Sequence, residues 1–272
     1  MSPRFFRRGR PEASDEIPAD LWEDCPSCHQ LLYTRDIEPL KVCNHCGYHF
    51  RLSLEARLAV TADEGSAEEW DADLAASDPL QFPDYPGKLA KAQEETGRVE
   101  GLFSGRAEIE ERPVALGIMD LAFFGGSMGY VVGEKIARLF ERAADLRLPA
   151  VVFCASGGAR MQESLISLMQ MAKTSGAAGK LRSAGVPYIS VLLDPTYGGV
   201  TASYAFLGDI ILAEPGVRLG FAGPRVIEVT RQRIRPDVQT AEYQHEHGMI
   251  DAVVPRSELR PTLAQIIRWA AE

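Results

Sequence analysis

Four cysteines near the N-terminus have the spacing of a metal site. They form two C-x2-C pairs with 14 residues between the pairs: Cys25, Cys28, Cys43 and Cys46. Each pair lets two thiolates bind one ion from a tight turn, and two pairs complete the tetrahedral shell of four sulfurs that Zn²⁺ takes in structural sites. Disulfides are the alternative, but they are rare in intracellular proteins. Because four thiolates leave no position open for water, the spacing predicts one structural zinc ion in a zinc ribbon over residues 21–50.

Two Gly-Gly pairs are the second chemical signal. Gly157 and Gly158 follow the apolar run AVVFCAS, and Gly198 and Gly199 follow the run that begins VPYISVLLD. Without Cβ atoms the backbone can approach a ligand closely, and free N–H groups at the start of a helix point at it. Two such amides that converge on one carbonyl oxygen form an oxyanion hole, so we expect these four glycines to be catalytic. The other interpretation is that they serve only close packing of helix and strand.

Other kinds of site have weaker support. The sequence has no GxxxxGK[ST] phosphate loop, and neither glycine pair lies in a GxGxxG motif. Ser156 and Ser203 do not stand in a GxSxG hydrolase elbow. Cys154 lies inside an apolar run and is predicted to be a small core residue rather than a nucleophile.

The glycine pairs lie in a segment where strand and helix patterns alternate, which predicts an α/β fold. Strands are predicted over residues 113–124, 150–156, 186–194, 209–215, 218–224 and 249–255. Helices are predicted over residues 133–149, 159–185, 200–209 and 257–272. The helix over 159–185 is long and amphipathic, because apolar residues recur along one face at Met161, Leu165, Leu168, Met169 and Ala172.

Length and charge limit the class of protein. A chain of 272 residues is expected to form one or two domains. The net charge of −9 argues against a polycation that coats nucleic acid. The acidic surplus lies in residues 61–112, so we predict an acidic helical connector over 51–112, after a flexible basic N-terminus over 1–20. No apolar run reaches the ~18 residues of a membrane span and no secretory signal is evident, so we expect a cytoplasmic protein without membrane contact.

Several long motifs resemble one known family. They are CPSCHQLLY, CNHCGYHFRLS, ASGGARMQE, LMQMAKTS, DPTYGGVTASYAFLGD and AEPGVRLGFAGPRVIE. Together they closely resemble the β subunit of the bacterial and plastid acetyl-CoA carboxylase carboxyltransferase, from about residue 20 to the end. The resemblance implies a crotonase-type (ClpP/crotonase) fold of stacked ββα units over residues 113–272, preceded by the zinc ribbon.

The resemblance also implies an activity and its partners. Carboxyltransferases of this family move a carboxyl group from carboxybiotin, held by a biotin carboxyl carrier protein, to acetyl-CoA. The product is malonyl-CoA, in the first committed step of fatty acid synthesis. The family works as a complex with an α subunit of similar fold, commonly α2β2, and the acyl-CoA site lies between the subunits. The resemblance explains why no side-chain base is evident, since the biotin ureido nitrogen can take the α-proton.

Alternatives remain open at this level. Arg160 and Arg225 stand beside glycine turns, and each either contacts CoA phosphates or forms a structural ion pair. The acyl group can differ, which would make the chain a carboxyltransferase or decarboxylase subunit for another acyl-CoA. The ribbon either caps the active site or binds nucleic acid, and in the latter case the protein would be a zinc-ribbon regulator.

Overall fold

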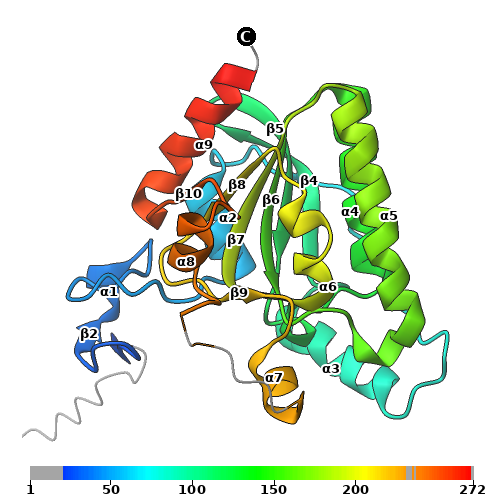
Figure 1. Ribbon diagram of the computed structural model, residues 1–272, viewed down its shortest axis with the longest axis horizontal. Coiled ribbons are helices and arrows are strands. Elements are labelled where there is room, and N and C mark those ends of the chain that lie inside the picture. Colours follow the sequence, from blue (N-terminus) through cyan, green and yellow to red (C-terminus); the bar gives the residue numbers. More distant parts are fainter. Residues whose placement is uncertain (1–20, 231–234, 236, 271–272) are drawn as a thin grey trace, which may run out of the picture.

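An eight-stranded mixed sheet organises the chain beyond the ribbon (Figure 1). The computed structural model describes residues 21–230, 235 and 237–270, with only the backbone of 224 and 225. The strand order is β10-β8-β7-β6-β5-β4-β3, and β9 pairs with the end of β7. The strands are β3 (Glu68–Glu69), β4 (Leu102–Ile109), β5 (Arg112–Met119), β6 (Ala150–Ser156), β7 (Tyr188–Tyr197), β8 (Ile210–Ala213), β9 (Leu219–Gly220) and β10 (Ala252–Val253).

The central strands are parallel because helices connect them. β5, β6, β7 and β8 run parallel, with Gly117 opposite Val152 and Val191 opposite Leu212. Every residue of β6 is buried, as expected for an apolar strand covered on both faces. The carboxyl ends of these strands therefore meet at one edge of the sheet, where a site can form.

Helices cover both faces of the sheet. α4 (Tyr130–Leu146) and α5 (Ser164–Ser183) lie on one face, while α2 (Leu54–Thr61) and α9 (Arg256–Ala270) lie on the other (Figure 1). The shorter helices are α1 (Thr34–Ile37), α3 (Tyr85–Thr96), α6 (Gly198–Thr201), α7 (Pro224–Thr230) and α8 (Ala241–Glu246). No helix among the described residues is both long and apolar enough to cross a membrane.

Most predicted elements of the body are confirmed, and one helix is not. Residues 200–209 do not form a continuous helix: α6 ends at Thr201, and a single 3₁₀ turn follows at Tyr204–Phe206. The hydroxyl of Thr201 donates to Thr196 O (2.9 Å) and that of Ser203 donates to Gly199 O (2.6 Å). Side chains of this kind compete for backbone groups and shorten helices.

The segment over 51–112 differs from the helical connector expected of it. It contains α2 and α3, but also β3 and β4, and β4 pairs antiparallel with β5 over its whole length. The strand was not predicted because the segment was interpreted from its acidic composition. The acidic residues lie mainly outside β4, whose residues Leu102, Phe103, Ala107 and Ile109 are buried. The segment is therefore part of the sheet, and the basic N-terminus over 1–20 lies outside the described residues.

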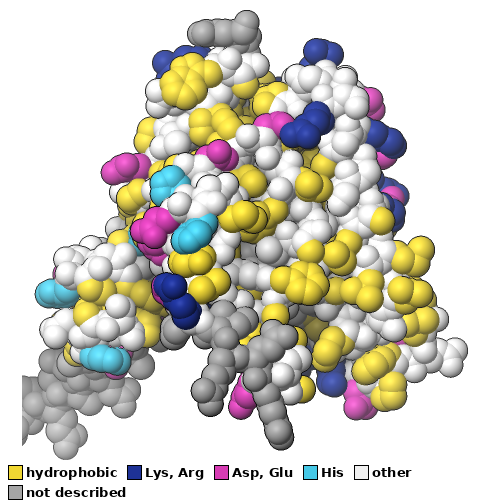
Figure 2. Space-filling model, in the orientation of Figure 1, with side chains coloured by type: hydrophobic (Ala, Val, Ile, Leu, Met, Phe, Trp, Pro, Cys, Tyr) yellow, Lys and Arg dark blue, Asp and Glu magenta, His cyan; other side chains and the backbone are white. Residues whose placement is uncertain are grey.

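The apolar face of α5 points away from the core. The helix begins at Ser164 rather than at 159, and its residues Leu165, Leu168 and Met169 are 65%, 50% and 62% exposed. Met161, in the 3₁₀ turn before it, is 79% exposed. The residues that α5 buries are mostly small or polar: Ser167, Gln170, Thr174, Ala177, Ala178 and Leu181. Figure 2 shows hydrophobic side chains gathered over the lower end of this helix. An amphipathic helix normally buries its apolar face, but no described residue covers this one.

Candidate functional site

The four cysteines of the ribbon converge on one point. β1 (Trp22–Asp24) and β2 (Leu31–Tyr33) form a small hairpin beside them. All four sulfurs lie within 4.8 Å of one another, with 3.6 Å between Cys25 and Cys46 and 3.8 Å between Cys28 and Cys43. A tetrahedral ion with bonds of about 2.3 Å needs sulfur–sulfur distances of about 3.8 Å. The predicted cysteine cluster is thus arranged to bind a metal ion.

A buried carboxylate joins the ribbon to the body. Glu214, directly after β8, is 2% exposed and accepts hydrogen bonds from Arg57 of α2 (2.7 Å) and Arg256 of α9 (2.6 and 2.9 Å). His49 of the ribbon lies 3.4 Å away, and Arg256 also donates to Leu40 O. Burial opposes ionisation, but the hydrogen bonds and the arginine charges outweigh it and hold the pKa of Glu214 far below its usual range. The ribbon is therefore docked through charged groups.

A cavity of about 520 Å³ lies between the ribbon and the sheet. Ribbon and linker residues 46–54 form one wall, and the ends of β5 to β8 form another. Four arginines line it (Arg51, Arg57, Arg218 and Arg256) against two carboxylates (Asp194 and Glu214). Arg57 is 4% exposed, and its Nε has no hydrogen-bond partner among the described residues. Arg51 and Arg218 pair with Asp194, and Arg57 and Arg256 pair with Glu214, so these six side chains together carry a net positive charge.

The two Gly-Gly turns meet backbone to backbone. Gly158 has a φ of +118° and Gly198 a φ of +61°. A Cβ on Gly198 would lie 3.0 Å from the Cα of Gly158, and one on Gly158 would lie 3.5 Å from the Cα of Gly198. The positive φ disfavours a side chain at either position, and at Gly198 the new Cβ would also lie too close to the opposite turn. The structure thus brings together the two turns that the sequence singled out.

The free amides at this contact differ in part from those expected. Gly157 N already donates to Gly125 O (2.9 Å) and Gly158 N to Ser156 Oγ (2.9 Å). Among the described residues, Ala159 N and Gly199 N have no acceptor, and each lies 3.9 Å from a Cβ position on the opposite turn. Ala159 was therefore missed by the sequence analysis, since only the tertiary hydrogen bonds reveal which amides are already used.

The nucleophile alternatives find no support here. Cys154 is fully buried, as predicted, and burial raises the pKa of its thiol to about 12. Ser156 and Ser203 bond to the backbone of the glycine turns. Ser127 does match GxSxG spacing within GGSMG, but its hydroxyl accepts from Arg160 Nε (3.2 Å), and no histidine contacts it among the described residues.

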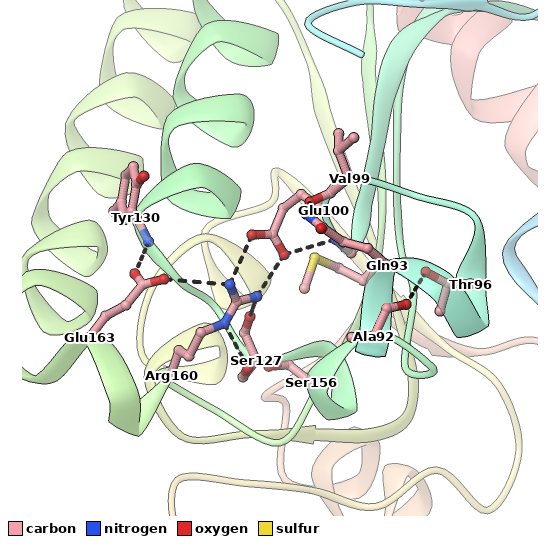
Figure 3. A network of polar contacts seen from close by, with 12 residues as sticks. Ala92, Gln93, Thr96, Val99, Glu100, Ser127, Tyr130, Ser156, Arg160 and Glu163 are labelled. Carbon is pink, nitrogen blue, oxygen red and sulfur yellow. Dashed lines mark hydrogen bonds and ion pairs between the residues drawn. The ribbon is translucent and has the colours of Figure 1, made fainter. Parts of the chain in front are cut away.

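Arg160 forms a structural ion pair rather than a ligand contact. Its side chain is fully buried and donates to both oxygens of Glu100, at 2.6 and 2.8 Å (Figure 3). Of the two interpretations of this residue, the ion pair is confirmed. The side chain of Arg225 is outside the described part of the structure.

Comparisons with known proteins agree with this geometry. The sequence profile of the carboxyl transferase domain family matches residues 63–263. The acetyl-coenzyme A carboxylase carboxyl transferase subunit beta of Desulforudis audaxviator is 55% identical over 260 residues, which cover 95% of this chain and 94% of the relative. That of Desulforamulus reducens is 52% identical and covers 93% and 88%.

Solved structures show the same fold. Transcarboxylase 12S, with methylmalonyl-coenzyme A and methylmalonic acid bound, superposes with a TM-score of 0.68 at 27% identity. The match covers 80% of this chain but only 41% of that longer one. The Pseudomonas malonate decarboxylase MdcD–MdcE hetero-dimer gives a TM-score of 0.61 at 26% identity, covering 81% and 86%. The predicted crotonase-type α/β fold is thus confirmed, and the chain belongs to the carboxyl transferase family, among the acetyl-CoA carboxylase carboxyl transferase β subunits.

Proposed function

We propose that this carboxyltransferase subunit converts acetyl-CoA to malonyl-CoA with carboxybiotin supplied by a biotin carboxyl carrier protein. The observation that carries the proposal is the contact of the two glycine turns, where Ala159 N and Gly199 N have no acceptor among the described residues. These amides would donate to the thioester oxygen as it gains charge. Each such donor is typically worth about 3–4 kcal/mol to the transition state.

The reaction balances without a side-chain base. The N–C bond of carboxybiotin breaks, and the ureido nitrogen takes a proton from the methyl carbon of acetyl-CoA. That carbon then bonds to the released carboxyl carbon, while the two amides hold the negative thioester oxygen. The chain itself binds and orients the thioester and stabilises its charge.

The metal of the ribbon is, in this proposal, one structural zinc ion per chain. Four thiolates at these distances suit Zn²⁺ and leave no position for a reacting water. The ribbon forms a wall of the arginine-lined cavity, and four arginines against two carboxylates match the phosphates of CoA. This arrangement favours a capping role over nucleic-acid binding.

The test is the reverse reaction. Malonyl-CoA and biotin are supplied, and release of acetyl-CoA is followed with this chain alone and with an α-type subunit, in protein that binds one zinc per chain. We expect activity only with the α subunit. Activity of the chain alone would contradict a shared site, and inactivity of both would contradict the assigned acyl group.

A second candidate is the same chemistry on another acyl group. The transcarboxylase neighbour holds methylmalonyl-coenzyme A, and another neighbour is a malonate decarboxylase. Methylmalonyl-CoA and malonate are therefore the substrates to compare in the same assay. Salt-steep binding of nucleic acid by an inactive protein would instead favour the regulator hypothesis. Cytoplasmic location stays a prediction.

We assign the exposed apolar face of α5 to the α subunit, in an α2β2 assembly. Leu165→Glu combined with Leu168→Glu should weaken binding of the α-type subunit at least ~100-fold, because charges would enter the centre of an apolar interface. Isothermal titration calorimetry measures the effect. The control is Trp269→Glu on α9, an apolar residue that is 62% exposed on the opposite side of the sheet. Equal loss in the control, or none in the double variant, would contradict this interface.

A further inference from the structure

The turn that presents Ala159 is held by its own side-chain network (Figure 3). Met128 N donates to Gly158 O (2.8 Å), and Arg160 N donates to Met128 O (3.0 Å). These two bonds hold Gly158 and Arg160, the residues on either side of Ala159, against the extended backbone at Met128. The direction of the Ala159 amide therefore depends on the placement of Arg160.

Arg160 uses its whole guanidinium to fix that placement. Nη1 and Nη2 donate to the two oxygens of Glu100, Nη2 also donates to Ser127 O (3.0 Å), and Nε donates to Ser127 Oγ (3.2 Å). Glu100 lies two residues before the start of β4, and Gly101 N donates to its Oε1 (2.8 Å). A planar guanidinium held by two carboxylate oxygens has one orientation, unlike a lysine ammonium. The turn is thus tied to a strand 60 residues away in sequence.

A second carboxylate completes the network. Glu163 accepts from Tyr85 OH (2.7 Å) and from Tyr130 N at the start of α4, and lies 3.4 Å from Arg160. Both carboxylates are fully buried, and Phe123 and Phe124 lie 5.7 and 5.2 Å from the guanidinium. Burying three charges is costly, and an apolar set of the same size would often be as stable. What this arrangement provides is a fixed orientation of the Arg160 guanidinium and of the turn that carries it.

We infer that Glu100 and Arg160 are positioning residues, which set the direction of the Ala159 amide toward the thioester oxygen. This inference rests on the proposed carboxyl transfer. Both side chains are fully buried and paired with each other, so their loss should leave substrate binding nearly unchanged. It should lower only the stabilisation of charge in the transition state, which appears as a fall in kcat without a matching change in KM.

The experiment uses the complex with an α-type subunit and wild-type activity as its reference. Glu100→Gln and Arg160→Lys keep side chains of similar size in the network but lose the two parallel hydrogen bonds between guanidinium and carboxylate. We expect kcat to fall about 100-fold, as for an atom misplaced by about 1 Å, with KM within ~3-fold. Ser127→Ala removes only the acceptor of Arg160 Nε, so it is the milder variant and should lower kcat several-fold. Glu141→Gln, which breaks an exposed pair with Lys180, is the matched control and should have no effect.

Zinc content and Tm establish that each variant is folded. Unchanged kcat in folded Glu100→Gln and Ser127→Ala would overturn the inference, as would a rise in KM at constant kcat, which indicates a binding role. If the wild-type complex itself transfers no carboxyl group, the proposed function fails instead, so the two failures are distinguishable.

Discussion

Gly198→Ala is expected to lower kcat for carboxyl transfer by a factor of about 10² to 10³. The new Cβ would lie 3.0 Å from the Cα of Gly158, at a φ of +61° that disfavours a side chain. Relief of this contact must separate the two turns, and the amides of Ala159 and Gly199 would no longer converge on one oxygen. Loss of one oxyanion donor typically costs this factor. Steady-state kinetics of the reverse reaction in the α-containing complex measure it.

Gly87→Ala is the matched control. It makes the same chemical change within α3, where a Cβ would meet nothing within 4 Å. Alanine is the better helix former by roughly 0.5–1 kcal/mol, so this variant should be fully active and slightly more stable. Gly158→Val should be as inactive as Gly198→Ala, with its zinc content intact, because Gly158 has a φ of +118°. Full activity of Gly158→Val and Gly198→Ala would exclude the oxyanion assignment.

Glu214→Gln is expected to cost about 3–5 kcal/mol of unfolding free energy. The carboxylate is the shared acceptor of Arg57 and Arg256, which are 4% and 5% exposed. Removal of its charge leaves two buried guanidinium groups uncompensated. Loss of only one partner of a buried ion pair destabilises a protein strongly, because the remaining charge is buried without a counter-charge. The ribbon should also separate from the body, because His49 and the Arg256 bond to Leu40 O depend on the same group. Chemical denaturation and hydrogen exchange over residues 40–57 measure the two effects.

The pH dependence of stability gives an independent check of Glu214. Its pKa is lowered in the folded protein, so its contribution is complete above the usual glutamate value of about 4.3. That contribution is lost as the pH falls below this value toward the folded pKa. Glu214→Gln should therefore lose less stability between pH 5 and acid conditions than wild type. Glu95→Gln, in an exposed pair with Lys91, is the control and should cost under ~0.5 kcal/mol. Wild-type-like stability of Glu214→Gln would show that the ribbon is docked by other contacts.

Features that depend on local chemistry were determined by the sequence itself. Two C-x2-C pairs bring four sulfurs together because each pair is a tight turn, and the structure places them within 4.8 Å. The apolar run Ala150–Ser156 became a fully buried strand, and α4 and α9 followed from helical periodicity. The two Gly-Gly pairs could also be recognised from the sequence, since one glycine of each pair, Gly158 and Gly198, has the positive φ that favours glycine.

Features that depend on which surfaces meet were decided only by the tertiary structure. Periodicity shows that α5 has an apolar face, but it cannot show that this face meets solvent, because burial depends on what packs against the helix. The acidic composition of residues 51–112 concealed β4, whose partner strand β5 supplies its hydrogen bonds. The role of Arg160 depended on Glu100, 60 residues earlier in the chain, which no local pattern links to it. The amides of Gly157 and Gly158 turned out to have acceptors and that of Ala159 none among the described residues, which only the whole fold decides, since its hydrogen bonds join residues far apart in sequence.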